Sequence, residues 1–173
     1  MRLTSFVLYL APVSAFTIPK GQPDGVYEVS YVDGQEIHSH VEPSSGKALR
    51  AEGQTEDAQA KFKRVGVICG GDALTHGDTD KANRSLDAQC DNGAIVGGNL
   101  SYYSIVGCTV AYYCNFDFKY FYCYASSRQQ ASRDITGTCG AYKSGWTNPG
   151  TDSYGYENFC KSLGNNFCGH GRN

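Results

Sequence analysis

The spacing of hydrophobic and polar residues predicts a short series of helices and strands after residue 64. In residues 78–90, apolar side chains recur every four positions at Ala82, Leu86 and Cys90, as on the inner face of a helix. Residues 100–106 and 108–115 are rich in tyrosine and β-branched side chains, and the second run alternates in the way that strands do. A third strand is expected over residues 119–124.

A second helix is predicted from about residue 126 to residue 136, with Ala131 and Ile135 on its inner face. Residues 140–173 are expected to contain one or two short strands within long loops. The order of helix, three strands, helix and strand favours an antiparallel sheet packed on two helices. We therefore expect a small α+β domain.

The cysteines narrow this fold class to a disulfide-rich domain. All eight follow residue 64, and none of their spacings is the C-x₂-C of a zinc site or a redox motif. Their even number predicts four disulfides, whose pairing the spacing alone does not determine. The residues concerned are Cys69, Cys90, Cys108, Cys114, Cys123, Cys139, Cys160 and Cys168.

The chain before residue 65 has two parts of different character. Arg2 precedes an apolar stretch at residues 3–11, which predicts a secretory signal peptide over residues 1–15, cut after Ala15. Residues 16–64 contain no cysteine and end at Lys63 and Arg64, a dibasic pair of the kind that processing proteases of the secretory route cleave.

We therefore expect a pro-like segment over residues 16–64 and a cysteine-rich domain over residues 65–173. Within the pro-like segment, residues 26–32 and 35–41 flank Asp33-Gly34, which predicts a β-hairpin. A lone hairpin is marginally stable in water, so this one must dock on the main domain or remain loose.

Charge and composition exclude several classes of partner. The 173 residues contain 15 Lys and Arg against 17 Asp and Glu, a net charge of −2, which argues against nucleic-acid binding. No apolar run approaches the roughly 20 residues of a membrane span. His38 and His40 lack a third ligand nearby, so we expect neither metal nor cofactor. Export makes Asn83 and Asn99, both in N-x-S triplets, candidate glycosylation sites of a monomeric secreted glycoprotein.

The sequence contains few groups that could perform catalysis. His76 and His170 are the only histidines after residue 64, and Glu157 is the only glutamate there. No G-x-S-x-G motif occurs, and thiols held in disulfides cannot act as nucleophiles. We expect a binding protein and assign no catalytic residue. The alternative is a small secreted hydrolase, such as a ribonuclease, that uses His76, Glu157 or His170.

Tyrosine is abundant after residue 64 and is a residue type that anchors protein interfaces. The alternatives are that these side chains fill the core, or that they stack on sugars as in a cell-wall glycan-binding protein built around Trp146. The expected binding residues are Tyr102, Tyr113, Tyr122, Tyr142, Trp146, Tyr154 and Tyr156.

Four stretches together give the chain a family resemblance: Cys69-Gly-Gly-Asp, residues 103–115, Cys139-Gly140 with Gly145-Trp146, and residues 153–160. Over about residues 66–168, the chain resembles the small cysteine-rich secreted proteins of filamentous fungi, including effector-type proteins of plant pathogens. The resemblance implies a virulence protein that binds in the host extracellular space, the apoplast of a plant. We specifically expect from this resemblance that the partner is a host extracellular protein and that the chain inhibits a host protease.

A second, shorter resemblance links residues 164–167 to microbial guanyl-specific ribonucleases. It does not extend to catalytic residues, because the predicted sheet carries no histidine.

Overall fold

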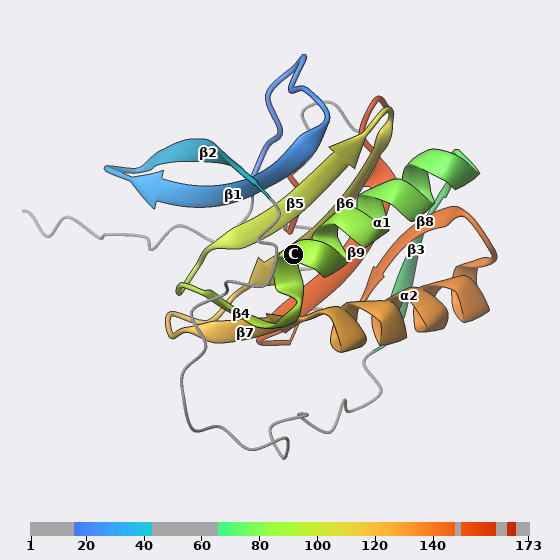
Figure 1. Cartoon of the computed structure of the whole chain (residues 1–173). Coiled ribbons are helices and arrows are strands. Elements are labelled where there is room, and N and C mark those ends of the chain that lie inside the picture. Colours follow the sequence, from blue (N-terminus) through green and yellow to red (C-terminus); the bar gives the residue numbers. More distant parts are fainter. Residues whose placement is uncertain (1–15, 43–65, 148–149, 162–165, 169–173) are drawn as a thin grey trace, which may run out of the picture.

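The computed structural model describes residues 16–42, 66–147, 150–161 and 166–168, and it has the expected α+β architecture (Figure 1). Two helices pack against a seven-stranded antiparallel sheet. The predicted signal peptide, the Lys63-Arg64 pair and His170 lie outside the described residues. The predicted fold class of a disulfide-rich antiparallel sheet with two helices is confirmed.

The helices are α1 (His76–Cys90) and α2 (Ala125–Cys139). The main sheet has the order β2-β1-β5-β6-β9-β8-β3. Its strands are β1 (Gly25–Val32), β2 (Gln35–Val41), β3 (Val67–Ala73), β5 (Ser101–Val106), β6 (Thr109–Asn115), β8 (Lys143–Thr147) and β9 (Asp152–Asn158). A separate two-stranded sheet pairs β4 (Asn92–Val96) with β7 (Phe121–Tyr124).

The cysteine-free hairpin docks on the main sheet. Its strand β1 pairs along β5, so that Tyr27 lies opposite Tyr103. The sheet consequently carries two histidines, His38 and His40, and the prediction that no histidine lies on the sheet is wrong. His38 Nδ1 lies 2.9 Å from the Tyr103 hydroxyl. Within the part of the chain that the structure describes, no group of three His, Cys, Asp or Glu side chains could hold a metal ion.

The strand predicted over residues 119–124 forms, but it does not join the main sheet. As β7 it pairs with β4, a strand that the sequence pattern did not indicate. A disulfide from Cys90 at the end of α1 to Cys123 in β7 ties this small sheet to the helical side of the molecule. β7 cannot pair with β6, although β6 directly precedes it, because β5 and β9 already occupy both edges of β6.

The middle of the main sheet is covered on both faces, which explains why every residue of β5 and β6 is buried. On one face, Leu86 of α1 and Ile135 of α2 pack on sheet residues such as Tyr113. On the other face, Phe16 and Phe167 cover Tyr103 and its neighbours. Phe16 and Phe167 exchange backbone hydrogen bonds of 2.9 and 2.8 Å, so segments from the two ends of the described chain close this second core together.

Aromatic side chains cross this second face in a single row. Tyr27, Tyr103 and Tyr112 are neighbours on successive strands, and Gly155 and Trp146 continue the row. A Cβ atom on Gly155 would lie 2.5 Å from the Tyr112 ring and 2.7 Å from Trp146 Cβ, so only glycine leaves room for both side chains.

All the cysteines are paired, as predicted, in four disulfides. The pairs are Cys69–Cys139, Cys90–Cys123, Cys108–Cys160 and Cys114–Cys168. Four disulfides in a chain of this size indicate an extracellular protein. Because residues 16–42 contain no cysteine, strands β1 and β2 are held to the sheet by non-covalent contacts alone.

Candidate functional site

Four of the tyrosines expected to bind a partner belong to the core. Tyr102, Tyr113, Tyr154 and Tyr156 are each at most 5% exposed and pack between the sheet and the helices. The expectation that they form a contact surface is therefore corrected, since the helices already cover them. Burial also raises the pKa of Tyr102 to about 12, with a further contribution from the charge of Glu28.

The remaining predicted residues do not form one surface either. Tyr142 lies on the helical side of the sheet, where its ring stacks on His76 with centroids 3.7 Å apart. Trp146 is half-buried on the opposite side, against the second core. Tyr122 is half-buried on β7 and lies 6.1 Å from the Tyr124 ring. A glycan-binding surface that combines Trp146 with Tyr142 is therefore ruled out by the sheet between them.

The candidate hydrolase residues that the structure describes are also separated. His76 begins α1 on the helical side of the sheet and is exposed. Glu157 is buried on the other side, where it accepts a 2.6 Å hydrogen bond from the Tyr112 hydroxyl. Burial and the adjacent Glu157 carboxylate raise the pKa of Tyr112 well above its usual value, so this hydroxyl stays protonated and keeps donating. His76 and Glu157 cannot share one cleft.

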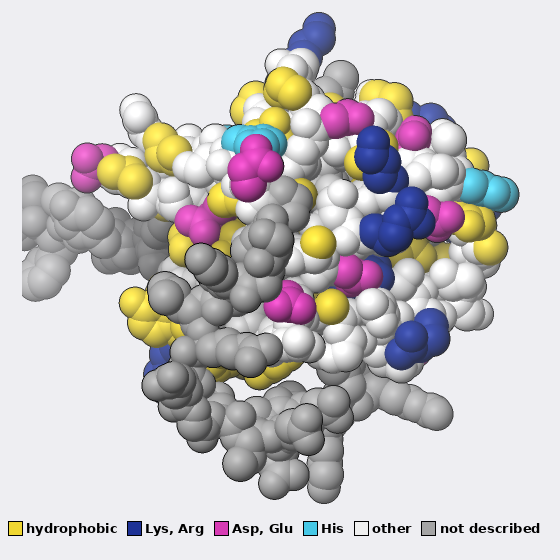
Figure 2. All heavy atoms as spheres, in the orientation of Figure 1, with side chains coloured by type: hydrophobic (Ala, Val, Ile, Leu, Met, Phe, Trp, Pro, Cys, Tyr) yellow, Lys and Arg dark blue, Asp and Glu magenta, His cyan; other side chains and the backbone are white. Residues whose placement is uncertain are grey.

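Among the described residues, the two most exposed large hydrophobic side chains lie in the connection between β6 and β7, residues 116–120. Phe118 is 74% exposed and Tyr120 is 75% exposed. Figure 2 shows hydrophobic side chains gathered at the end of the molecule where this connection runs. We call residues 116–120 the aromatic loop. Two phenylalanines and a tyrosine within five residues are unusual for a loop that faces solvent.

The aromatic loop is held in one conformation by the buried side chain of Asn115. Its amide nitrogen donates to the carbonyl oxygens of Gly97 at 2.8 Å and Lys119 at 3.0 Å, and its side-chain oxygen accepts from the Asp117 backbone at 2.9 Å. The neighbouring turn packs closely as well, because a Cβ atom on Gly98 would lie 2.2 Å from the Phe118 carbonyl oxygen. The loop therefore presents Phe118 and Tyr120 on a fixed backbone.

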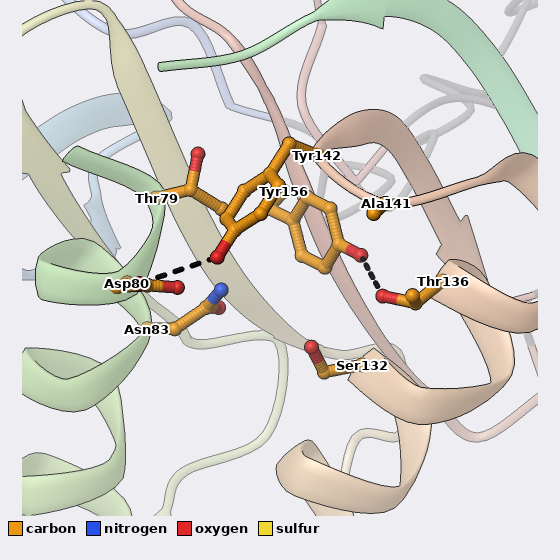
Figure 3. Close-up of a pocket in the computed structure, with 8 residues that line it drawn as sticks. All are labelled: Thr79, Asp80, Asn83, Ser132, Thr136, Ala141, Tyr142 and Tyr156. Carbon is orange, nitrogen blue, oxygen red and sulfur yellow. Dashed lines mark hydrogen bonds between the residues drawn. The ribbon is translucent and has the colours of Figure 1, made fainter. Parts of the chain in front are cut away.

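A second feature is an open pocket of about 260 Å³ between α1 and α2 (Figure 3). Its walls carry hydroxyl, amide and carboxylate groups. The Tyr142 hydroxyl lies 3.4 Å from Asp80, and the Tyr156 hydroxyl lies 3.3 Å from Thr136. The lining residues are Thr79, Asp80, Asn83, Ser132, Thr136, Ala141, Tyr142 and Tyr156.

An ion pair joins the two helices next to Asn83, one of the residues that line this pocket. The Arg128 guanidinium of α2 forms a two-pronged contact with the Asp87 carboxylate of α1, with one distance of 2.9 Å. Its remaining nitrogen, Nη1, donates to Asn83 Oδ1 at 2.9 Å. The sequence could not indicate this cluster, because the ionic partners lie 41 residues apart.

The two predicted glycosylation sites occupy different surroundings. Asn83 is half-buried in α1 and lines the pocket between the helices. Asn99 lies in the turn between β4 and β5, with a left-handed φ of 58°, and its backbone donates to Asp117 beside the aromatic loop.

Comparisons of the chain with models of protein families, with curated proteins and with solved structures found no match. Among the described helices, none has the length and apolar character needed to cross a membrane.

Proposed function

We propose that this protein is an extracellular binding protein that contacts a protein partner through the aromatic loop. The observation that carries the proposal is the exposure of Phe118 and Tyr120 on a backbone that Asn115 holds in place. Exposed aromatic side chains of this size contribute nothing to the core. A loop that is already ordered loses little further conformational freedom on binding, which favours affinity.

The partner class we propose is an extracellular protease, in line with the effector-type resemblance of the sequence. An exposed Phe118 on a fixed loop matches the apolar specificity pocket of a chymotrypsin-like enzyme. The four disulfides support this role, because they limit the local unfolding that a protease needs in order to cut a bound chain.

The test is a titration of the purified protein against chymotrypsin-like, trypsin-like and papain-like proteases, with residual activity as the readout. We expect inhibition of a chymotrypsin-like enzyme, reduced at least about 30-fold by Phe118→Ala, as for the removal of a central anchor. A Phe118→Lys variant should move inhibition toward a trypsin-like enzyme, whose pocket carries an aspartate. Val32→Ala is the matched control, because Val32 is 55% exposed on β1, outside the aromatic loop.

The absence of inhibition in all three classes would reject the protease as partner. Inhibition that Phe118→Ala leaves unchanged would reject the aromatic loop as the contact surface. A thermal unfolding curve for each variant shows whether a loss of inhibition reflects a loss of folding.

A further inference from the structure

The pocket between α1 and α2 is not used by the proposed function, and one of its lining residues, Asn83, begins an N-x-S triplet. We propose that Asn83 is N-glycosylated and that the first sugar of its glycan, an N-acetylglucosamine, occupies this pocket. A residue that can be glycosylated therefore lines a cavity that can hold the attached sugar.

The orientation of the Asn83 amide is the first argument. A guanidinium only donates hydrogen bonds, so the atom of Asn83 that faces Arg128 Nη1 at 2.9 Å must be the oxygen, Oδ1. The amide nitrogen therefore lies on the side away from Arg128. Figure 3 shows the Asn83 side chain directed into the space between the helices and the two tyrosines. An N-linked sugar is attached to this nitrogen, so the attached sugar starts inside the pocket.

The chemistry of the walls is the second argument. A sugar ring presents hydroxyl groups that both donate and accept, together with an apolar face. The pocket offers the Asp80 carboxylate, the hydroxyls of Ser132 and Thr136, and the rings and hydroxyls of two tyrosines. Its volume of about 260 Å³ is below the roughly 300–1,000 Å³ of pockets for drug-sized ligands, which favours a single sugar unit.

The backbone of Tyr142 is the third argument. Its φ of 53° is left-handed, which is an outlier for a bulky residue and strains the backbone. In this conformation the ring stacks on His76 and the hydroxyl reaches toward Asp80, so that Tyr142 forms a wall of the pocket. Strain of this kind is concentrated at sites that hold ligands.

The covalent step takes place on the unfolded chain during export, before α1 forms around Asn83. The Asn83 amide nitrogen loses one proton and forms a bond to C1 of the first sugar of a lipid-linked oligosaccharide donor. The bond between C1 and the lipid pyrophosphate oxygen breaks, and the lipid pyrophosphate leaves. Folding of α1 against α2 then places the attached sugar between the helices.

The experiment uses the full chain secreted from a yeast that performs N-glycosylation, with Ser85→Ala as the variant that removes the triplet and keeps Asn83. Glycopeptide mass spectrometry should find the glycan on Asn83. An endoglycosidase that leaves one N-acetylglucosamine then gives a protein with a single sugar. We expect nuclear Overhauser contacts between its acetyl methyl group and the rings of Tyr142 and Tyr156.

The trimmed protein should also unfold about 2–4 °C above Ser85→Ala, as expected for a modest stabilisation in a chain of this size. A Ser132→Leu variant fills the pocket and should remove the contacts while the glycan stays attached. An unmodified Asn83 would overturn the proposal, and so would a glycan without contacts to either tyrosine. The contacts are measured on the natural sequence, so the conclusion stands even if Ser132→Leu fails to fold.

Discussion

Removal of residues 16–64 by cleavage at Lys63-Arg64 would take away a large part of the free energy of unfolding. If residues 16–64 were removed, the remaining chain would lose β1, β2 and the segment that covers the second core. Five apolar side chains of this segment are at most 4% exposed: Phe16, Ile18, Val26, Tyr27 and Val29. At about 1.5–3 kcal/mol for each buried side chain, their burial contributes about 8–15 kcal/mol to the free energy of unfolding. That range matches the entire net stability of a typical domain, about 5–15 kcal/mol.

We therefore expect a protein that begins at Val65 to be far less stable than the full chain, although it keeps all four disulfides. Its sheet would end at β5, which would expose an unpaired strand edge and the Tyr103 side chain. Guanidinium unfolding of the two proteins, followed by circular dichroism, measures the difference. The control is the full chain with Lys63→Ala and Arg64→Ala, which a dibasic protease cannot cut.

A third sample distinguishes cleavage from removal. The full chain cut at Lys63-Arg64 should keep its hairpin bound, and its midpoint should then depend on protein concentration, because a dissociable fragment stabilises by mass action. A protein starting at Val65 that unfolds within about 2 kcal/mol of the full chain would refute this reasoning and would make the hairpin dispensable.

Three further predictions concern single contacts. Arg128→Ala should lower the free energy of unfolding by about 3–5 kcal/mol, because it leaves the Asp87 charge without its partner. Arg128→Lys should not restore the two-pronged contact. A loss below about 1 kcal/mol would show that the ion pair does not hold the helices together. Desolvation raises the pKa of Asp152 to about 6, so the folded state binds more protons than the unfolded state between about pH 4 and 6. Stability should fall as pH rises through this range, and Asp152→Asn should remove the fall in unfolding titrations at pH 4 to 7; an unchanged slope would contradict this assignment. Replacing Cys114 and Cys168 by alanine removes a disulfide that joins residues 54 positions apart, and it should lower the free energy of unfolding by about 4 kcal/mol. An unchanged melting temperature would show that hydrogen bonds alone hold residues 166–168 in place.

The helices and central strands could be predicted from the sequence because their periodicity depends on local burial. Ala82 and Leu86 face the sheet at helical spacing, as expected, and so do Ala131 and Ile135. The helix starts were less accurate, since α1 is preceded by Thr75 and α2 by Tyr124, and neither residue forms a side-chain cap. The helices begin at His76 and Ala125 rather than at the predicted residues 78 and 126, because tertiary packing contributes more to where a helix starts than a side-chain cap of about 1 kcal/mol.

The parts that the sequence did not reveal depend on contacts between distant residues. Strand β3 contains Cys69 and two glycines, and four of its seven residues are exposed, so its pattern is that of a loop. The alternation of β1 shows that one face is buried but not what buries it. The candidate site was missed for a related reason: whether an aromatic residue such as Phe118 or Tyr113 fills the core or meets solvent depends on which elements pack around it.

The pairing of Phe16 with Phe167 limits where a tag can be attached to a chain that begins at Phe16. Phe16 directly follows the predicted cut after Ala15, is fully buried and exchanges backbone hydrogen bonds with Phe167. An affinity tag fused at this point would have to leave from the interior of the molecule. The turn at Asp33-Gly34 on the β1–β2 hairpin is a better place for a label, because both residues are exposed; Gly34 itself should be kept, since its left-handed φ of 78° strains any side chain.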